Sequence, residues 1–285
     1  MKNGERPRFA AMREPLFLTS RERAVADLYG ELHRQADASF ARRHIVPRFV
    51  RHLRELGLDP ETALRGKSFL DAGCGGFAGG AAAAVELGAR EILGIDLSAA
   101  NVRSARERFR HCPHVRFRRE NLIRLSLESE SWDFIYCVGV LMCLEQPPAA
   151  FRQLVRVLKP GGRIYIGVYG SGGLYNRLAV PAARLAGRIV PRRITASFLK
   201  RWLPAWLKPT TSLMDLMYVP IDRHYRVAEV RRWFEEAGME ATFLRHPEQP
   251  RTLRNRLLFG EGSMIYFSAV KPRAAGPAGG TEDLS

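Results

Sequence analysis

The feature that most constrains the fold is a regular alternation between short apolar runs and helical segments across the middle of the chain. Short apolar runs that stop at turn residues are typical of buried strands. Helices between such strands bring them into a mostly parallel sheet covered on both faces. The expected strands are 67–72, 91–96, 115–119, 132–138 and 162–169, and the expected helices between them are 79–87, 99–110 and 149–158. The sequence therefore predicts an α/β doubly wound domain.

Helical signals precede this alternation. Residues 1–18 look irregular, and Thr19 and Glu22 then form a capping box, which predicts a helix running to about His44. Pro47 can start a second helix, which Gly57 ends. We expect residues 1–60 to form an N-terminal helical segment that acts as a lid. The sheet domain is expected to comprise 61–170 and 220–271.

The regular pattern returns near the end of the chain. Residues 226–237 are expected to form a helix, because Gly238 stands in the C-cap position. Strands at 239–245 and 263–270 follow, joined by a direct loop with no convincing helix, so we expect them to pair antiparallel. The tail 272–285 is of low complexity and is expected to be disordered.

Composition excludes several classes of protein. With 285 residues, 46% of them hydrophobic, the chain has enough apolar material for a buried core, unlike a disordered or collagen-like chain. No run of 18 apolar residues occurs, so no spanning helix is expected. The charged N-terminus has no secretory core, which favours a cytoplasmic location. The four cysteines form no CxxC pair or zinc pattern, so we expect reduced, mostly buried thiols and no metal site.

The positive charge is concentrated in one region. The formal net charge is +16, but only six of the 45 basic residues are lysines, a skew that fits coding bias as well as a polyanionic partner. Between Gln146 and Met214 there is no Asp or Glu, while twelve Arg or Lys occur. We therefore expect the positive charge to be concentrated on one surface of the molecule.

A glycine-rich loop and an acidic residue carry the strongest chemical signal. The segment LDAGCGG at residues 70–76 follows the first strand, and its glycines let the backbone approach a ligand closely. Asp96 ends the next strand, 23 residues after Gly73, where a carboxylate can accept both hydroxyls of a ribose. Each such bond contributes about 1.5–3 kcal/mol. Together the two elements predict a nucleoside ligand.

The identity of that nucleoside depends on Asp71. Residues 73–78 also satisfy the GxGxxA form of a dinucleotide site. Asp71, however, would bring a carboxylate close to a pyrophosphate, whereas it suits an ammonium or a sulfonium. No GxxxxGK[ST] segment occurs, so a P-loop is absent.

Four motifs in fixed order resemble those of class I S-adenosylmethionine-dependent methyltransferases, in particular the small-molecule, methyltransferase type 11-like group. They are LDAGCG at 70–75, GIDLS at 94–98, WDFI at 132–135 and LKPGG at 158–162. The resemblance covers residues 65–170 and 226–271, about half of the chain. It implies a seven-stranded sheet whose last strand is antiparallel, which agrees with the direct closing loop expected above. It also implies S-adenosyl-L-methionine as the cofactor.

The resemblance assigns roles by position. It implies that the cofactor-binding residues are Asp71, Gly73 and Gly75 for the methionine part, Asp96 for the ribose, and Leu97, Asn121, Leu122 and Val138 around the adenine and the strand ends. Asn121 departs from the usual carboxylate, yet its amide oxygen can accept from an adenine amino group. Met142 and Cys143 stand where many small-molecule relatives have histidines, so a histidine base is not expected there.

Methyl transfer of this kind is a direct displacement, in which the enzyme mainly aligns the acceptor and excludes water. A general base is needed only where the acceptor loses a proton. The candidates are Tyr169, at the end of the fifth strand, and His224. His224 is favoured over His33 and His44, because its segment leads into the recovered sheet domain. The alternative is a surface or structural role for His224.

Residues 171–219 interrupt the sheet pattern and are expected to form a basic helical insertion, here called the cap. Leu174, Leu178, Leu185 and Ile189 fall on one helical face, edged by arginines, and Ile194, Phe198 and Trp202 recur every four residues. One interpretation is a helical cap packed on the sheet domain with its arginines in water. A second is peripheral contact of residues 174–208 with an anionic membrane. A third is a lid that recognises an anionic or lipid-linked acceptor.

The leading hypothesis is methyl transfer to a small-molecule or lipid-like acceptor. An RNA methyltransferase is supported by net charge alone, since no NPPY-type tetrapeptide follows the fourth strand and no RNA-binding module occurs, so nucleic acid is not the expected partner. A non-catalytic cofactor-binding protein is a further alternative, against which the intact Asp71, glycines and Asp96 argue. The sequence leaves the acceptor, the methylated atom and the oligomeric state open.

Overall fold

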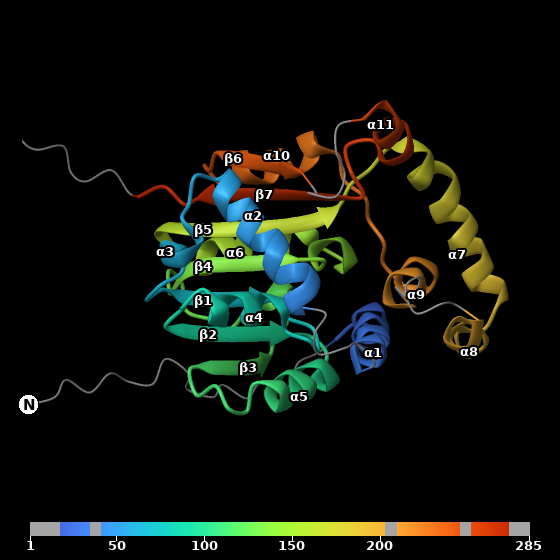
Figure 1. Cartoon of the computed structure of the whole chain (residues 1–285), viewed down its shortest axis with the longest axis horizontal. Helices are drawn as coiled ribbons and strands as arrows, with labels where there is room; N and C mark the ends of the chain where they lie inside the picture. Colours follow the sequence, from blue (N-terminus) through green and yellow to red (C-terminus); the bar gives the residue numbers. More distant parts are fainter. Residues whose placement is uncertain (1–17, 35–40, 203–209, 246–251, 274–285) are drawn as a thin grey trace, which may run out of the picture.

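The computed structural model describes residues 18–34, 41–202, 210–245 and 252–273, and its centre is a seven-stranded sheet (Figure 1). The strand order is β3-β2-β1-β4-β5-β7-β6. The strands are β1 (Ser68–Ala72), β2 (Glu91–Asp96), β3 (Val115–Arg119), β4 (Trp132–Val138), β5 (Leu158–Tyr169), β6 (Ala241–Arg245) and β7 (Met264–Val270).

Neighbouring strands from β3 to β5 are parallel, and β7 runs antiparallel to both β5 and β6. The doubly wound, mostly parallel sheet is thereby confirmed. β5 begins at Leu158 rather than at 162, because Leu158 already pairs with Trp132 before the register shifts. The loop expected at LKPGG therefore belongs to the strand.

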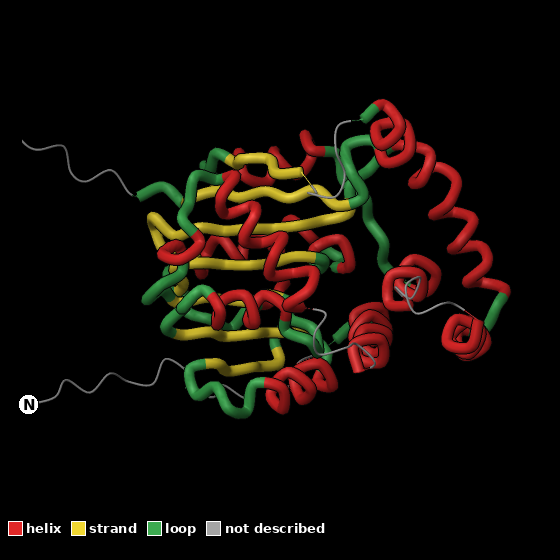
Figure 2. Tube along the Cα trace, in the orientation of Figure 1, coloured by secondary structure: helices red, strands yellow, loops and turns green. Residues whose placement is uncertain are grey.

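Helices cover both faces of the sheet (Figures 1 and 2). One face packs on α2 (Val46–Glu55), α4 (Gly79–Glu86) and α5 (Ala99–Arg108), and the other on α6 (Pro147–Val157) and α10 (Val227–Glu236). Alternate strand residues face the two layers: Phe69 belongs to the core with α2 and α4, and Leu70 to the core with α6. This alternation is the two-residue period of a strand buried on both faces.

The N-terminal helix α1 (Ser20–Arg34) lies beyond the carboxyl ends of the parallel strands (Figure 1). Its capping box is confirmed: the Thr19 amide donates to Glu22 Oε2 at 2.9 Å, and the Glu22 amide donates to Thr19 Oγ1 at 3.1 Å. Residues 35–40 lie outside the described part. The chain continues through a π-helical turn, η1 (Ala41–Ile45), into α2, and α3 (Pro60–Ala63) precedes β1.

The cap is helical, and its described helices are η4 (Tyr175–Ala179), α7 (Val180–Ile189), α8 (Arg192–Trp202) and α9 (Thr210–Tyr218). Residues 203–209 lie outside the described part, as does the expected disordered tail beyond Arg273. Within the described ranges, no helix is long and apolar enough to cross a membrane.

The connection from β6 to β7 corrects one expectation, because it contains a helix, α11 (Leu253–Phe259). Thr252 caps this helix by accepting from the Asn255 amide at 3.2 Å. Phe259 at its end contacts the Tyr175 ring, with centroids 5.7 Å apart. The direct loop expected from the sequence is therefore wrong, although the antiparallel pairing of the two strands is right.

Candidate functional site

The glycine loop after β1 adopts a conformation that other residues rarely take. Gly73 and Gly75 have φ angles of 83° and 63°. A Cβ on Gly73 would lie 2.2 Å from Val140 Cγ2. The Gly73 and Cys74 amides both donate to the Ile95 carbonyl, at 2.8 and 2.9 Å, which ties the loop to the end of β2. The bend and the second strand therefore form one rigid unit.

Asp96, at the end of β2, lies directly beside this loop. Its Oδ2 accepts from the Gly75 amide at 2.9 Å, and its Oδ1 accepts from the Ser98 amide at 2.8 Å and from Asn101 Nδ2 at 3.2 Å. Burial raises the pKa of Asp96, and these donors oppose the shift. Two carboxylate oxygens offer about four acceptor positions, so three bonds leave Asp96 able to accept another.

Asp71, at the end of β1, is almost fully buried and holds the start of α4. Its Oδ2 accepts from the Ala81 amide at 2.8 Å. Burial raises the pKa of Asp71 to about 7, with the charge of Asp96 adding to the rise and the hydrogen bonds from Ala81 and Gly80 opposing it. Asp71 is thus a carboxyl group that titrates near neutral pH at the edge of the glycine loop.

A cavity of about 240 Å³ lies at the carboxyl ends of the strands. All eight residues expected to bind the cofactor line it, namely Asp71, Gly73, Gly75, Asp96, Leu97, Asn121, Leu122 and Val138. Helix α1 contributes Val25, Ala26, Tyr29 and His33 to the same lining. The structure therefore brings the motif residues together under the N-terminal helix.

His33, which the sequence analysis set aside, lies on the glycine loop. The Gly76 amide donates to its Nδ1 at 3.3 Å, and its ring packs edge-on against Phe77 with centroids 4.7 Å apart. Burial lowers the pKa of His33 to about 4, so the imidazole is neutral at pH 7. The signal that would have indicated this position is the spacing of Tyr29 and His33, four residues apart on one face of α1.

Asn121, the departure from the expected carboxylate, connects the helix to β3. Its Nδ2 donates to Glu22 Oε1 at 2.9 Å, and its Oδ1 accepts from the Ile123 amide at 2.9 Å, at the start of η2 (Leu122–Arg124). Glu22 is 4% exposed and also caps α1. The amide oxygen of Asn121 keeps one acceptor position.

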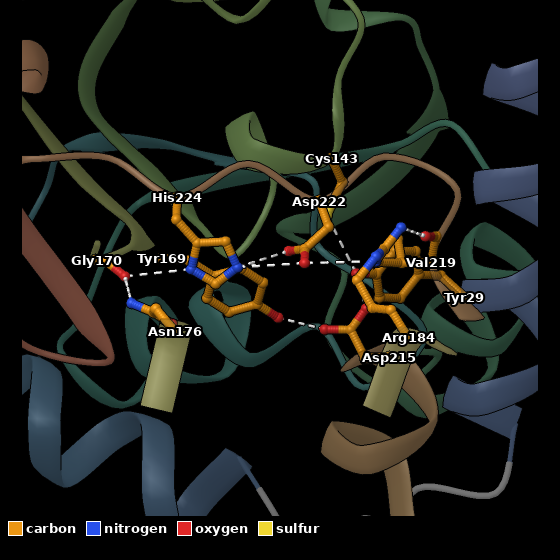
Figure 3. A network of polar contacts seen from close by, with 10 residues as sticks. All are labelled: Tyr29, Cys143, Tyr169, Gly170, Asn176, Arg184, Asp215, Val219, Asp222 and His224. Atoms are coloured by element: carbon orange, nitrogen blue, oxygen red, sulfur yellow. Dashed lines mark hydrogen bonds and ion pairs between the residues drawn. The ribbon is translucent and has the colours of Figure 1, made fainter. Parts of the chain in front are cut away.

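A polar cluster stands between the cavity and the cap (Figure 3). Tyr29 OH donates to Asp215 Oδ1 at 2.5 Å and lies 3.2 Å from Cys143 Sγ, in η3 (Leu141–Cys143). Tyr169 OH donates to Asp215 Oδ2. Burial raises the pKa of Asp215, whereas the two phenol donors oppose that rise. Helix α1, the end of β5 and the cap helix α9 thus meet at one buried carboxylate.

His224 lies behind this cluster and does not line the cavity. Its Nε2 lies 3.2 Å from Asp222 Oδ2, its Nδ1 lies 3.2 Å from the Gly170 carbonyl, and its ring stacks on Tyr169 (Figure 3). Burial would lower the pKa of His224, but the hydrogen bond and the charge of Asp222 raise it above its usual value. Both ring nitrogens face acceptors, so the surroundings favour the imidazolium.

Tyr169 and His224, the two residues favoured as catalytic, therefore lie side by side behind the residues that line the cavity. Tyr169 contacts the cluster through Asp215, and His224 contacts Tyr169. The side chains that reach the cavity from this side are Tyr29, Cys143 and Leu144. Cys143 occupies the place where histidines were expected in relatives, and its thiol is buried.

Sequence comparison with known proteins finds similarity to methyltransferases. Residues 70–166 match a family described as methyltransferase domain. A ubiquinone biosynthesis O-methyltransferase of Pseudomonas putida is 28% identical over 189 residues, covering 63% of this chain and 80% of that protein.

Two solved structures share the fold. The complex between the Haloferax volcanii Trm112 methyltransferase activator and a methyltransferase gives a TM-score of 0.58 at 16% identity, covering 88% of this chain and 99% of that one. The magnesium protoporphyrin IX methyltransferase from Synechocystis, solved with bound SAH, gives 0.52 at 16% identity, covering 86% and 93%. At these identities the likeness is one of fold.

Proposed function

We propose that this chain, a class I S-adenosylmethionine-dependent methyltransferase, methylates a hydroxyl group of a small, largely apolar acceptor. The observation that carries the proposal is the single cavity in which the motif residues and Tyr29 meet, with Asp215 bonded to Tyr29 from behind. The similarity to an O-methyltransferase supports the choice of oxygen as the methylated atom.

The residues around the glycine loop fit S-adenosyl-L-methionine. Asp96 has an acceptor position left for a ribose hydroxyl, and Leu97 and Leu122 supply apolar contacts for the adenine. Asp71 is the carboxylate for the ammonium of the methionine part, and Gly73 and Gly75 allow the tight bend beside it, because a Cβ on either would collide with Val140 or His33. When bound, the cofactor supplies a methyl group already activated for displacement.

The acceptor end of the cavity is formed by Tyr29, Cys143 and Leu144. We place the acceptor hydroxyl against Tyr29 OH. As the acceptor loses its proton to the Tyr29 oxygen, Tyr29 passes its own proton to Asp215 Oδ1, so that one proton enters and one leaves the phenol. Burial raises the pKa of Asp215, which makes it a better match for a proton from a phenol.

Tyr169 and His224 act in this proposal as positioning residues. Tyr169 fixes the second oxygen of Asp215, and His224 packs on the Tyr169 ring. Because Asp215 belongs to α9, the cap takes part in the chemistry of the acceptor side. This supports the expectation that the cap is an acceptor lid.

The test compares Tyr29→Phe with Tyr218→Phe. Tyr218 belongs to the same polar surroundings of the cap, but its hydroxyl donates to the Val190 carbonyl at 2.9 Å and does not line the cavity. Transfer of an isotopically labelled methyl group to a panel of phenols, amines and RNA is measured by mass spectrometry, and cofactor binding by calorimetry.

We expect labelled methyl ethers from the wild type. Tyr29→Phe should lower their formation by about a hundredfold or more, the range of general acid–base catalysis, with cofactor affinity kept. Tyr218→Phe should change neither. Labelled amines or RNA in place of ethers would overturn the assignment of oxygen, and cofactor binding without any transfer would favour a non-catalytic role.

A further inference from the structure

The cap exposes an unusual amount of apolar surface. Six large apolar side chains on η4, α7 and α8, or just before them, are between 49% and 74% exposed: Leu174, Leu178, Leu185, Ile189, Ile194 and Phe198. We call this set the outer cap face. Its four leucine and isoleucine positions from 174 to 189 are those expected to share one helical side. The structure turns that side away from the protein.

The inner side of α7 shows why the helix cannot be rotated. Val180 is buried, and a Cβ on Gly187 would lie 2.4 Å from the Met217 carbonyl oxygen of α9. Arg184 lies 3.4 Å from Asp222 Oδ2 and donates to the Val219 carbonyl at 3.2 Å. These three residues stand at positions i, i+4 and i+7, which define one face of a helix. The opposite face, with Leu185 and Ile189, must therefore point outward.

Helix α11 extends this apolar surface from a distant part of the sequence. It packs on η4 through Phe259 and Tyr175, and its Leu253 and Leu257 are 74% and 59% exposed. Figure 1 shows α11 at the same end of the molecule as α7. Large exposed apolar side chains gathered on neighbouring helices are typical of an interaction surface.

The outer cap face belongs to a strongly basic stretch of the chain. The stretch from Gln146 to Met214 carries no acidic residue. Arg177, Arg188 and Arg193 are exposed on the same helices, and Arg254 is exposed on α11. Apolar side chains flanked by arginines are the composition of surfaces that insert into the interface of an anionic bilayer, where each basic residue adds attraction to the lipid headgroups.

The same composition disfavours two other partners. A second copy docked face to face would bring two arginine-rich surfaces together, which is repulsive. A nucleic acid satisfies the arginines, yet it offers no apolar phase to cover the leucines and isoleucines. The lipid surface satisfies both kinds of side chain.

We propose that the outer cap face docks on an anionic lipid bilayer. The cap and α1 both lie beyond the carboxyl ends of the parallel strands (Figure 1), so docking turns the end of the sheet that bears the cavity toward the membrane. The inference stands independently of the methylated atom, since it rests on the exposed side chains alone.

Co-sedimentation of the full chain with vesicles tests the proposal. Vesicles of phosphatidylglycerol and phosphatidylcholine are compared with pure phosphatidylcholine, at low and high salt. The variants are Leu185→Ser/Ile189→Ser and Arg177→Glu/Arg188→Glu. The matched control is Arg65→Glu/Arg90→Glu, an equal charge change on exposed arginines that precede β1 and β2 at the opposite end of the sheet. Thermal unfolding and calorimetry of cofactor binding verify that every variant is folded.

We expect binding to anionic vesicles that weakens with salt and is small on phosphatidylcholine. Arg177→Glu/Arg188→Glu should lower the partition coefficient by about thirtyfold or more, and Leu185→Ser/Ile189→Ser by about tenfold. The control pair should have a clearly smaller effect. Absence of sedimentation at low salt would overturn the proposal, as would equal losses in the two arginine pairs. A dimer in light scattering that Leu185→Ser/Ile189→Ser dissociates would also overturn it and assign the face to a second copy.

Discussion

Apolar side chains repeat regularly in both the sheet and the cap, with a strand period in one and a helical period in the other, but those of the central strands are covered, whereas many of those of the cap are exposed. In the sheet, Leu70 and Phe69 are completely buried, because helices close both faces. In the cap, Ile189 is 74% exposed, because Val180, Gly187 and Arg184 have already taken the inner side of α7. A pattern thus tells which residues share a face, whereas neighbouring elements decide whether that face is covered. The sheet contains the sequence motifs, whereas the cap contributes exposed apolar side chains and one buried carboxylate, Asp215.

The largest effect should come from Asp96→Ala, which removes the acceptor at the ribose position and the partner of the Gly75 amide. Loss of one bond to a charged acceptor, together with the contact that holds the glycine loop, predicts a decrease in affinity for S-adenosyl-L-methionine of up to about a hundredfold. Calorimetry measures it. Glu91→Ala, at the other end of β2, is the control and should bind normally. Unchanged affinity in Asp96→Ala would remove the basis of the cofactor assignment.

Asp215 belongs to the cap, yet we expect it to affect methyl transfer in the cavity at the end of the sheet. Asp215→Asn keeps the shape of the side chain but removes the charge that accepts the proton, so methyl transfer should fall by about a hundredfold. Affinity for the cofactor should stay within about twofold, since Asp215 does not line the cavity. Single-turnover assays and calorimetry measure the two quantities. Equal losses in both would mean that Asp215 only holds α1 in place.

The pH dependence of cofactor binding should report Asp71 in the sheet. Burial raises its pKa to about 7, so below that pH the free protein holds a neutral carboxyl that must lose its proton to attract an ammonium. Affinity should therefore rise with pH between 6 and 8, by up to about tenfold per unit below 7. Calorimetry across this range measures it, and Asp71→Asn should flatten the curve. An unaltered slope in that variant would assign the titration to another group.

The smallest effects are expected from single substitutions on the inner and outer sides of α7. Val180→Ala removes buried methyl groups and should lower the free energy of unfolding by about 1–2 kcal/mol. Ile189→Ala removes a larger side chain, yet it should change that free energy by less than about 0.5 kcal/mol. Denaturant unfolding measures both. A larger loss in Ile189→Ala would show that the outer cap face is covered in the free protein.

The sequence predicts those parts of the candidate site that are local in the chain. The glycine bend and Asp96 can be recognised because a strand end and the following turn carry the necessary residue types within a few positions. The acceptor side could not be assembled in this way. Tyr29 and Asp215 are 186 residues apart, and only the packing of α1 against α9 brings them together. Helix α11 was missed although Thr252 precedes Leu253 and Leu257 at helical spacing.

The Glu22 carboxylate makes two contacts that link helix α1 to the cavity. Glu22 accepts from the Thr19 amide at the start of α1 and also from Asn121 Nδ2 beside the cavity. Because α1 also lines the cavity, a movement that lifts this helix away from it must break the contact between Glu22 and Asn121. A displacement of α1 from the cavity would therefore also loosen the first turn of this helix.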